Sequence, residues 1–413
     1  MSLLRHPRLL RALCALAVVT TAGAAALSSG SAAAKKRTAA ASGHVYTETN
    51  DATNNQVLIF SRGANGKLTK AGAVSTGGKG GIQLQPGCAP TCPFLDTQGE
   101  LALTPDGRLL FAVNAGSNTI TSFRATANGL KRVSVVSSRG KFPESLTVQG
   151  HLLYVVNANS LNVAGFRVSD SGKLSSIAGS SKKLIGSAIP GLARQIGFDN
   201  TGTVLVVSLF GNPTMGSNKD SIDTIAIKSN GKPGKETTHD STQPYPFGFA
   251  FDPRNHLVMS QVTGLSGSPD GTTATFKIGA GGSSLKPIST AATNGFAPCW
   301  VVVTGNGRHA FVVNTGGPAP SGATVTQFNL YPTGKLTRTG VTTPQSSEFA
   351  LTDEALSSSS RYLYVLSPAE SGGRAPGPNG HIDEFRVGSD GSLTLIGATP
   401  STPGPGLSGL VAR

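Results

Sequence analysis

The strongest constraint on the fold is an internal repeat. Seven segments share one pattern, in which an alternating strand with a large apolar residue at its centre leads into a polar, glycine-containing turn. Alternation at period 2 predicts strands with one buried face, and turns such as Asn-Gly and Asp-Gly accept the positive φ angles of tight hairpins. The central residues are Phe60, Phe123, Phe166, Ile225, Phe276, Phe328 and Phe385.

Two further series accompany these strands. A near-continuous apolar run precedes each one, which predicts a strand buried on both faces; the runs are 44–49, 109–114, 152–157, 204–209, 257–262, 310–315 and 362–367. A third series of predicted strands lies upstream of six of these runs, at 100–104, 144–148, 194–198, 247–251, 300–304 and 353–357. The first repeat lacks this strand, and we expect residues 406–413 to supply it by pairing beside residues 45–49.

The spacing of the repeats selects the architecture. Equivalent positions from Asn114 to Ser367 lie 43, 51, 52, 54 and 53 residues apart, which suits a four-stranded blade. The chain contains 53 Gly and 25 Pro, as expected for many short strands joined by turns. We therefore predict an all-β, seven-bladed β-propeller with four-stranded blades, closed by the C-terminal strand pairing into the first blade.

The first residues are expected to lie outside this fold. Arg5, Arg8 and Arg11 precede an apolar, Ala-rich run, and small residues follow it, an order typical of a secretory signal peptide. We assign residues 1–34 to that peptide, 35–43 to a flexible linker and 44–413 to the propeller. A membrane anchor is the alternative, but the run is shorter than a spanning helix needs. The mature protein is thus expected to be secreted or attached to the cell surface, without a membrane span, and monomeric.

Cysteine and charge limit the partners. Cys88 and Cys92 lie in a Gly- and Pro-rich insertion, where an exported protein favours a local disulfide; two Cys without further ligands do not complete a metal site. The net charge is +14, but no basic cluster alternates with aromatic residues as in nucleic-acid grooves. We expect no cofactor, no metal and no nucleic acid. A basic surface attracted to anionic cell-surface polymers is the simplest interpretation of the charge.

With its repeats aligned, the chain resembles the lactonase-type seven-bladed propellers, a family that includes a 6-phosphogluconolactonase and a carboxymuconate-cyclising enzyme. The resemblance covers residues 43–413 and is carried by the stretches at 104–124, 246–253, 299–316 and 359–365. It implies a site at one mouth of the central channel, built by residues that open the innermost strands. Of the family's Pro-Arg-His run, Arg194 is retained while Gln195 replaces the His. Glu354 matches a family Glu, and Glu144 lies where the family has a His-rich opening.

The candidate site follows from that resemblance and from the residue chemistry. Arg can hold a carboxylate or stabilise an oxyanion, and a desolvated Glu can act as general base, so the catalytic candidates are Arg194, Glu354 and Glu144. The ligand-binding candidates are Gln195, Trp300, Asp353 and Glu100.

Two functions remain open from the sequence. One is an exported hydrolase that opens a lactone or a sugar-acid ester at the channel mouth. The other is a non-catalytic propeller that binds an anionic ligand, a cell-surface polymer or a protein. In the second case, Arg194 would pair with Glu144, Asp353 or Glu354 to neutralise a polar channel rim.

Overall fold

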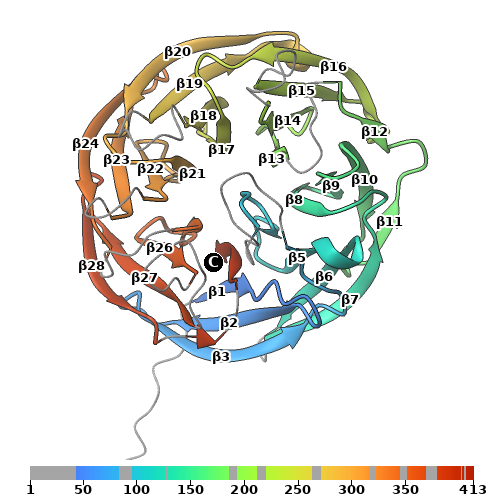
Figure 1. Cartoon of the computed structure of the whole chain (residues 1–413), viewed down its shortest axis with the longest axis horizontal. Coiled ribbons are helices and arrows are strands. Elements are labelled where there is room, and N and C mark those ends of the chain that lie inside the picture. The colour runs from blue at the N-terminus through green and yellow to red at the C-terminus, as the bar shows by residue number, and fades with distance from the viewer. Residues whose placement is uncertain are drawn as a thin grey trace, which may run out of the picture. The chain divides into compact units, whose positions relative to one another are not determined.

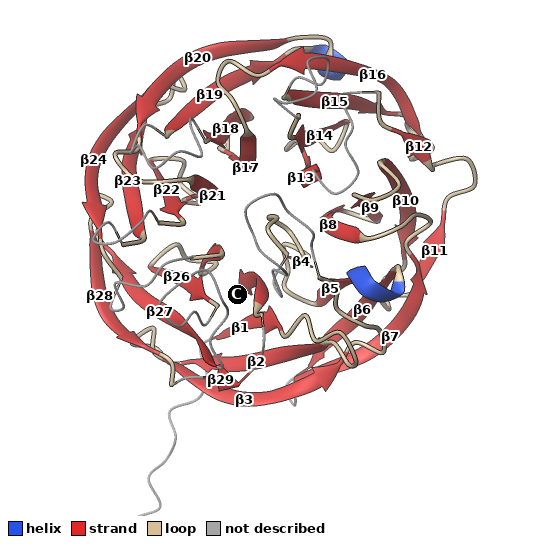
Figure 2. Cartoon of the chain, in the orientation of Figure 1, coloured by secondary structure: helices blue, strands red, loops and turns tan. Residues whose placement is uncertain are grey.

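The computed structural model describes residues 43–82, 95–126, 129–185, 193–211, 220–262, 271–316, 322–344, 351–368, 379–400, 402–403 and 406–413. The expected signal peptide, the linker up to residue 42, and the pair Cys88 and Cys92 lie outside these residues. The described part forms a ring of seven antiparallel sheets around a central axis (Figure 1), and it contains almost no helix (Figure 2). The predicted seven-bladed propeller is therefore confirmed.

The strands are given from the inside of each blade outward. Blade 1 holds β30 (Ser408–Ala412), β1 (Gly43–Glu48), β2 (Gln56–Arg62) and β3 (Leu68–Ser75). Blade 2 holds β4 (Leu101–Leu103), β5 (Leu109–Asn114), β6 (Thr119–Thr126) and β7 (Gly129–Ser137). Blade 3 holds β8 (Pro143–Gln149), β9 (Leu152–Asn157), β10 (Asn162–Val168) and an outer edge of β11 (Leu174–Ser176) and β12 (Lys182–Lys183). Blade 4 holds β13 (Ala193–Phe198), β14 (Val204–Leu209), β15 (Ser221–Ile227) and β16 (Pro233–Asp240).

The remaining blades repeat the order. Blade 5 holds β17 (Pro246–Phe251), β18 (His256–Gln261), β19 (Thr272–Ile278) and β20 (Leu285–Ala292). Blade 6 holds β21 (Pro298–Val303), β22 (His309–Asn314), β23 (Thr324–Leu330) and β24 (Leu336–Thr342). Blade 7 holds β25 (Asp353–Leu356), β26 (Tyr362–Ser367), β27 (Asn379–Val387) and an outer edge of β28 (Leu393–Ala398) and β29 (Thr402–Pro403). Two short 3₁₀ turns, Ala115–Ser117 and Ala280–Gly282, are the helical elements described, and neither is long enough to cross a bilayer.

Burial follows the three sequence series. All six residues of β5, β14, β22 and β26 are buried, as expected for apolar runs that face neighbouring blades on both sides. The outermost strands instead expose alternate residues to solvent, as in β7. The core is therefore divided among the interfaces between adjacent blades, which leaves the inner strands free to line the central channel.

The two ends of the propeller meet in blade 1. β30 pairs antiparallel with β1, with Tyr46 opposite Val411 and Thr47 opposite Leu410. The Thr47 hydroxyl also donates to the Ser408 carbonyl oxygen at 3.2 Å. In Figure 1 the C-terminus accordingly lies on the inner side of the ring beside β1. The predicted closure by the last strand is confirmed.

Candidate functional site

The predicted site residues all lie where inner strands begin. Glu144 and Arg194 are the unpaired residues at β-bulges near the starts of β8 and β13, and Trp300 directly follows the bulge at Cys299 in β21. Bulges re-aim side chains, here at one end of the channel. The structure thus brings the predicted residues to the same end, but their side chains are only 0–8% exposed. The full set is Glu100, Glu144, Arg194, Gln195, Trp300, Asp353 and Glu354.

Residues 95–100, here called the channel segment, cover this end of the channel. The side chain of Gln98 donates to the Val301 carbonyl oxygen at 2.8 Å and accepts from the Val301 N–H at 3.1 Å. Its backbone N–H donates to the carbonyl oxygen of Arg194 at 3.0 Å. A Cβ on Gly248 would lie 2.3 Å from Gln98 Oε1, so only glycine fits at that position. Gln98 thus bonds to β21 through its side chain and to β13 through its backbone, and its side chain lies close to β17.

Further hydrogen bonds join the channel segment to two more inner strands, β8 and β30. The indole N–H of Trp300 donates to the Thr97 carbonyl oxygen at 2.6 Å, and the Thr97 hydroxyl donates to the Glu144 carbonyl oxygen at 3.1 Å. The backbone N–H of Leu95 donates to Ser408 Oγ at 2.9 Å, which reaches β30. Trp300 therefore holds the segment in place.

Arg194 is engaged within the protein. Its guanidinium donates to the Asp96 carbonyl oxygen at 3.0 Å and lies 3.6 Å from the Asp96 carboxylate, while only 1% of the side chain is exposed. The same guanidinium stacks over the ring of Phe210, 4.4 Å from its centroid. Burial raises the pKa of the Glu144 carboxyl, and the Arg194 charge partly offsets that rise. Arg194 thus forms an ion pair with Asp96, which is not among the three partners that the sequence suggested.

Gln195 links two strands. Its side-chain amide donates to the Phe249 carbonyl oxygen at 2.9 Å, and its amide oxygen accepts from the Phe249 N–H at 2.6 Å. Both ends of the amide are therefore occupied by the backbone of β17. The residue that replaces the family His thus connects neighbouring inner strands.

Four buried carboxyl groups gather around the closing strand. The Asp353 carboxylate accepts from the Leu410 N–H at 2.6 Å, and Glu48 accepts from the Asn55 amide at 3.0 Å. Burial raises the pKa of Glu48, Glu100, Asp353 and Glu354 well above their ordinary values, and the Asp353 charge raises that of Glu100 and Glu354 further. Among the described residues, neither carboxyl oxygen of Glu354 has a well-formed hydrogen bond, although nearby backbone at Val302 and Val313 offsets part of the pKa rise.

These raised pKa values predict how stability depends on pH. An acid whose pKa is raised on folding stabilises the fold below its unfolded pKa, and that contribution is lost as the pH rises through its folded pKa. Glu354→Gln should therefore melt at a higher temperature than wild type at pH 8, by about 2 °C per kcal/mol regained. The gain should disappear as the pH falls below about 4.5, the ordinary pKa of Glu. Calorimetry across this range measures the difference.

Both proteins contain His44 and His239, so the difference between their melting temperatures reports on Glu354. Burial lowers the pKa of these two histidines, and their contribution to stability therefore rises with pH, opposite to that of Glu354. Asp106→Asn is the control, because its exposed carboxylate has a pKa lowered mainly by the Thr104 hydroxyl. That variant should show no gain at pH 8. A Glu354→Gln protein that melts at or below the wild-type temperature at pH 8 would contradict the prediction.

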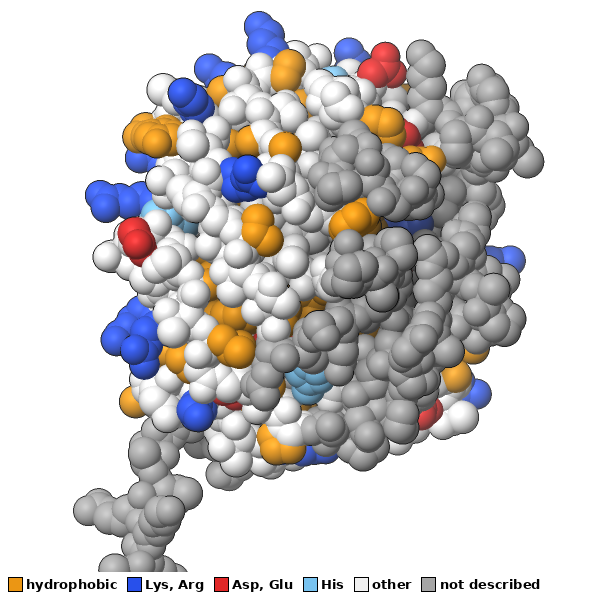
Figure 3. Space-filling model, turned by 60° about the vertical axis from the view of Figure 1, so that its left-hand side comes forward, with side chains coloured by type: hydrophobic (Ala, Val, Ile, Leu, Met, Phe, Trp, Pro, Cys, Tyr) orange, Lys and Arg blue, Asp and Glu red, His pale blue; other side chains and the backbone are white. Residues whose placement is uncertain are grey.

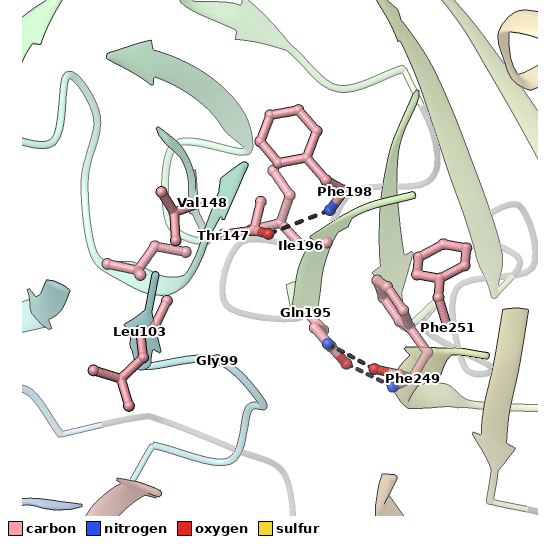
Figure 4. Close-up of a pocket in the computed structure, with 12 residues that line it drawn as sticks. Gly99, Leu103, Thr147, Val148, Gln195, Ile196, Phe198, Phe249 and Phe251 are labelled. Atoms are coloured by element: carbon pink, nitrogen blue, oxygen red, sulfur yellow. Dashed lines mark hydrogen bonds between the residues drawn. The ribbon is translucent and has the colours of Figure 1, made fainter. Parts of the chain in front are cut away.

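A hollow lies on the other side of the channel segment. It has a volume of about 320 Å³ and lies between β4, β8, β13 and β17, mainly at the ends where these strands lead into their turns. Figure 4 shows Phe198, Phe251, Leu103 and Val148 around it, with Gln195 bonded to Phe249 at its edge. Its lining contains no ionisable side chain, and the Thr147 hydroxyl accepts from the Phe198 N–H at 3.3 Å. We call this hollow the channel pocket.

Sequence reasoning found few of the residues that shape these features. Of the predicted site residues, only Gln195 lines the channel pocket. The apolar pocket residues form part of the alternation that already predicted inner strands, so nothing marked them as ligand contacts. Asp96 and Gln98 were missed because they precede the predicted strand. The catalytic and ligand-binding roles of the predicted residues stay predictions.

The comparisons with known proteins come from sequence and from structure. The model of a family described as lactonase, seven-bladed β-propeller, matches residues 53–183, which span most of the first three blades. The resemblance to the lactonase-type propellers is confirmed. Among curated proteins, none matches this chain by sequence.

Solved structures agree in architecture. The periplasmic gluconolactonase of Pseudomonas aeruginosa is 17% identical, with a TM-score of 0.62 over 90% of this chain and 98% of that one. A candidate 6-phosphogluconolactonase from Bacteroides fragilis is 15% identical, with a TM-score of 0.63 over 90% and 98%. A protein from Lactobacillus plantarum is 12% identical, with a TM-score of 0.65 over 90% and 99%. At these identities the likeness concerns the fold alone.

Proposed function

We propose that this chain is an exported, non-catalytic lactonase-type propeller that binds a small, uncharged molecule in the channel pocket. The pocket carries the proposal: its volume of about 320 Å³ suits a small ligand, and its lining of apolar side chains, backbone polar groups and the uncharged Thr147 and Gln195 contains no ionisable side chain. The polar strand openings support it as well, since Arg194 is committed to Asp96 and Phe210. Export is proposed from the signal-peptide pattern of residues 1–34.

Filling the pocket tests this proposal. Ala102 lines the pocket and is partly exposed, so Ala102→Phe should occupy the space that a ligand needs. A melting-temperature screen of the mature protein with aliphatic lactones, aromatic alcohols and sugar lactones should find an uncharged binder, because a ligand raises stability by mass action. The Ala102→Phe variant should bind that compound at least about tenfold more weakly and show a smaller rise in melting temperature. Ala73→Phe, on the exposed face of β3, is the matched control and should bind like wild type.

Either of two results would overturn the binding proposal. One is that no compound in the screen stabilises the wild-type protein. The other is that Ala102→Phe binds the identified compound as tightly as the Ala73→Phe control.

Hydrolysis of a lactone is the second candidate, and Glu354 favours it. Its carboxyl is buried, its pKa is raised well above the ordinary value, and its oxygens lack well-formed hydrogen bonds among the described residues. Such a group could donate or accept a proton at neutral pH. Proton release from the same lactone panel decides between the functions: turnover that disappears in Glu354→Gln would support the hydrolase, whereas binding without turnover would support the binding protein.

A further inference from the structure

The turns that join the first and second strands of blades 2 to 7, and those that join the third and fourth strands of the blades, form one continuous surface. Antiparallel strands place both kinds of turn at the same edge of a blade. Adjacent blades touch there: Arg413 donates to the Gly107 carbonyl oxygen at 2.7 Å, Asn200 to that of Asp252 at 2.6 Å, and the Gly305 N–H to Ser360 Oγ at 2.9 Å. We call this surface the turn face. It comprises residues 63–67, 104–108, 149–151, 169–173, 199–203, 228–232, 252–256, 279–284, 304–308, 331–335, 357–361 and 388–392.

The turn face is strongly basic. These turns contain nine Lys and Arg residues and five Asp residues, and two of the Asp side chains, Asp199 and Asp252, are buried at 3% and 0% exposure. Every blade contributes at least one cation, so positive charge surrounds the end of the channel. In Figure 3, Lys and Arg side chains gather along the left edge of the view. The cations are Lys67, Arg108, Lys173, Lys228, Lys232, Arg254, Arg308, Lys335 and Arg361.

The backbone presents most of these cations in the same way. Seven of the nine directly follow a residue in the left-handed conformation, usually the turn glycine. Gly107 and Gly307, for example, have φ of 66° and 65° and precede Arg108 and Arg308. Positive φ is cheap for glycine and fixes the shape of a tight turn. The backbone therefore places these cations at equivalent positions along one edge of the ring.

The side chains between the charges narrow the class of partner. Tyr331, 44% exposed, is the one large hydrophobic side chain exposed on the described turn face, and the His151 imidazole is exposed there as well. Binding of single-stranded nucleic acid uses several stacking aromatics, and docking to a membrane surface uses apolar side chains that insert. A hydrophilic polymer that carries carboxylates at regular intervals needs neither. Such a polymer could contact several blades at once, and contacts that are weak singly then combine into strong binding.

We infer that the turn face binds an acidic polysaccharide. This inference is independent of the ligand in the channel pocket and of any turnover there. The attraction acts between opposite charges that are exposed to water, and dissolved ions screen it. The affinity should therefore fall steeply as the salt concentration rises.

The test compares two variants with the same change in net charge. The first replaces Lys173, Lys228, Arg308 and Lys335 by Gln on the turn face. The second replaces four exposed cations of the outer strands by Gln, at Lys70, Lys235, Lys286 and Arg338. Both sets contain three Lys and one Arg, and all eight side chains are exposed. Affinity for polygalacturonate is measured at about 0.15 M salt, with neutral dextran as the negative control.

The wild-type protein should bind polygalacturonate and leave dextran unbound. The turn-face variant should lose about tenfold or more in affinity, whereas the outer-strand variant should stay within about twofold. Equal losses in both variants would overturn the inference, because general attraction by net charge would then explain the binding. So would tighter binding of single-stranded DNA or of anionic lipid vesicles than of polygalacturonate, or no binding by the wild-type protein at this salt concentration.

Discussion

A chain that ends at Leu407 is expected to aggregate instead of folding into a closed ring. This truncation removes β30 and leaves the inner edge of β1 unpaired, where Val45, Tyr46 and Thr47 are 0–1% exposed in the intact protein. Unpaired strand edges template association between molecules. Removal of the buried Leu410 side chain alone costs about 2–5 kcal/mol. The truncated protein should elute as aggregates in size-exclusion chromatography and show no cooperative melting transition.

A shorter truncation is the control. A chain that ends at Ala412 keeps the pairing of β30 with β1 and loses only Arg413, whose side chain bonds to Gly107 and His44. It should remain monomeric and melt within a few degrees of the wild-type protein, about what surface changes cost. If the chain ending at Leu407 melts like this control, the ring does not depend on its last strand.

Replacement of Arg194 by Ala is expected to destabilise the protein by about 3–5 kcal/mol, the usual cost of breaking a buried ion pair. The substitution leaves Asp96 without the guanidinium 3.6 Å away and removes the stacking on Phe210. It also removes the charge that offsets the raised pKa of Glu144. Chemical denaturation measures the loss as a lower midpoint at an unchanged slope.

A double substitution separates charge from packing. The variant that combines Arg194→Met with Asp96→Asn lacks both the guanidinium and its carboxylate partner. Its loss in free energy of unfolding should therefore be smaller than the sum of the losses in the two single variants. Arg254→Ala, on an exposed turn, should change stability by no more than about 0.5 kcal/mol. An Arg194→Ala protein as stable as wild type would show that the guanidinium is free, and the ligand-anchoring role suggested by the sequence would regain its basis.

The fold could be predicted because its signals are local and repeated. Phe60, Phe123 and their equivalents set the alternation, the apolar runs marked the strands buried on both faces, and the missing first copy predicted where residues 406–413 pair. Each signal depends on side-chain periodicity within a few residues. The repetition of the pattern seven times then fixed the architecture.

The channel segment could not be predicted in the same way. Most of its contacts are to backbone groups of distant strands, such as the Gln98 side chain with Val301 and the Trp300 indole with Thr97. Backbone partners carry no sequence signature, so nothing in residues 95–100 indicated that they cross the channel. The polar residues at the strand openings lie at the same end of the channel, as the sequence implied, but only the structure shows that the channel segment covers them.

The channel segment has a consequence for how such a ring can evolve. In a simple repeat protein each unit touches only its neighbours, so units can be gained or lost by duplication without disturbing distant ones. Here a short stretch before blade 2 is bonded at once to blades 1, 3, 4 and 6, through Ser408, Glu144, Arg194 and Val301. An extra or missing blade would change the distances that these bonds span. The hydrogen bonds of the channel segment therefore match a ring of seven blades, and gain or loss of a blade by duplication would break them.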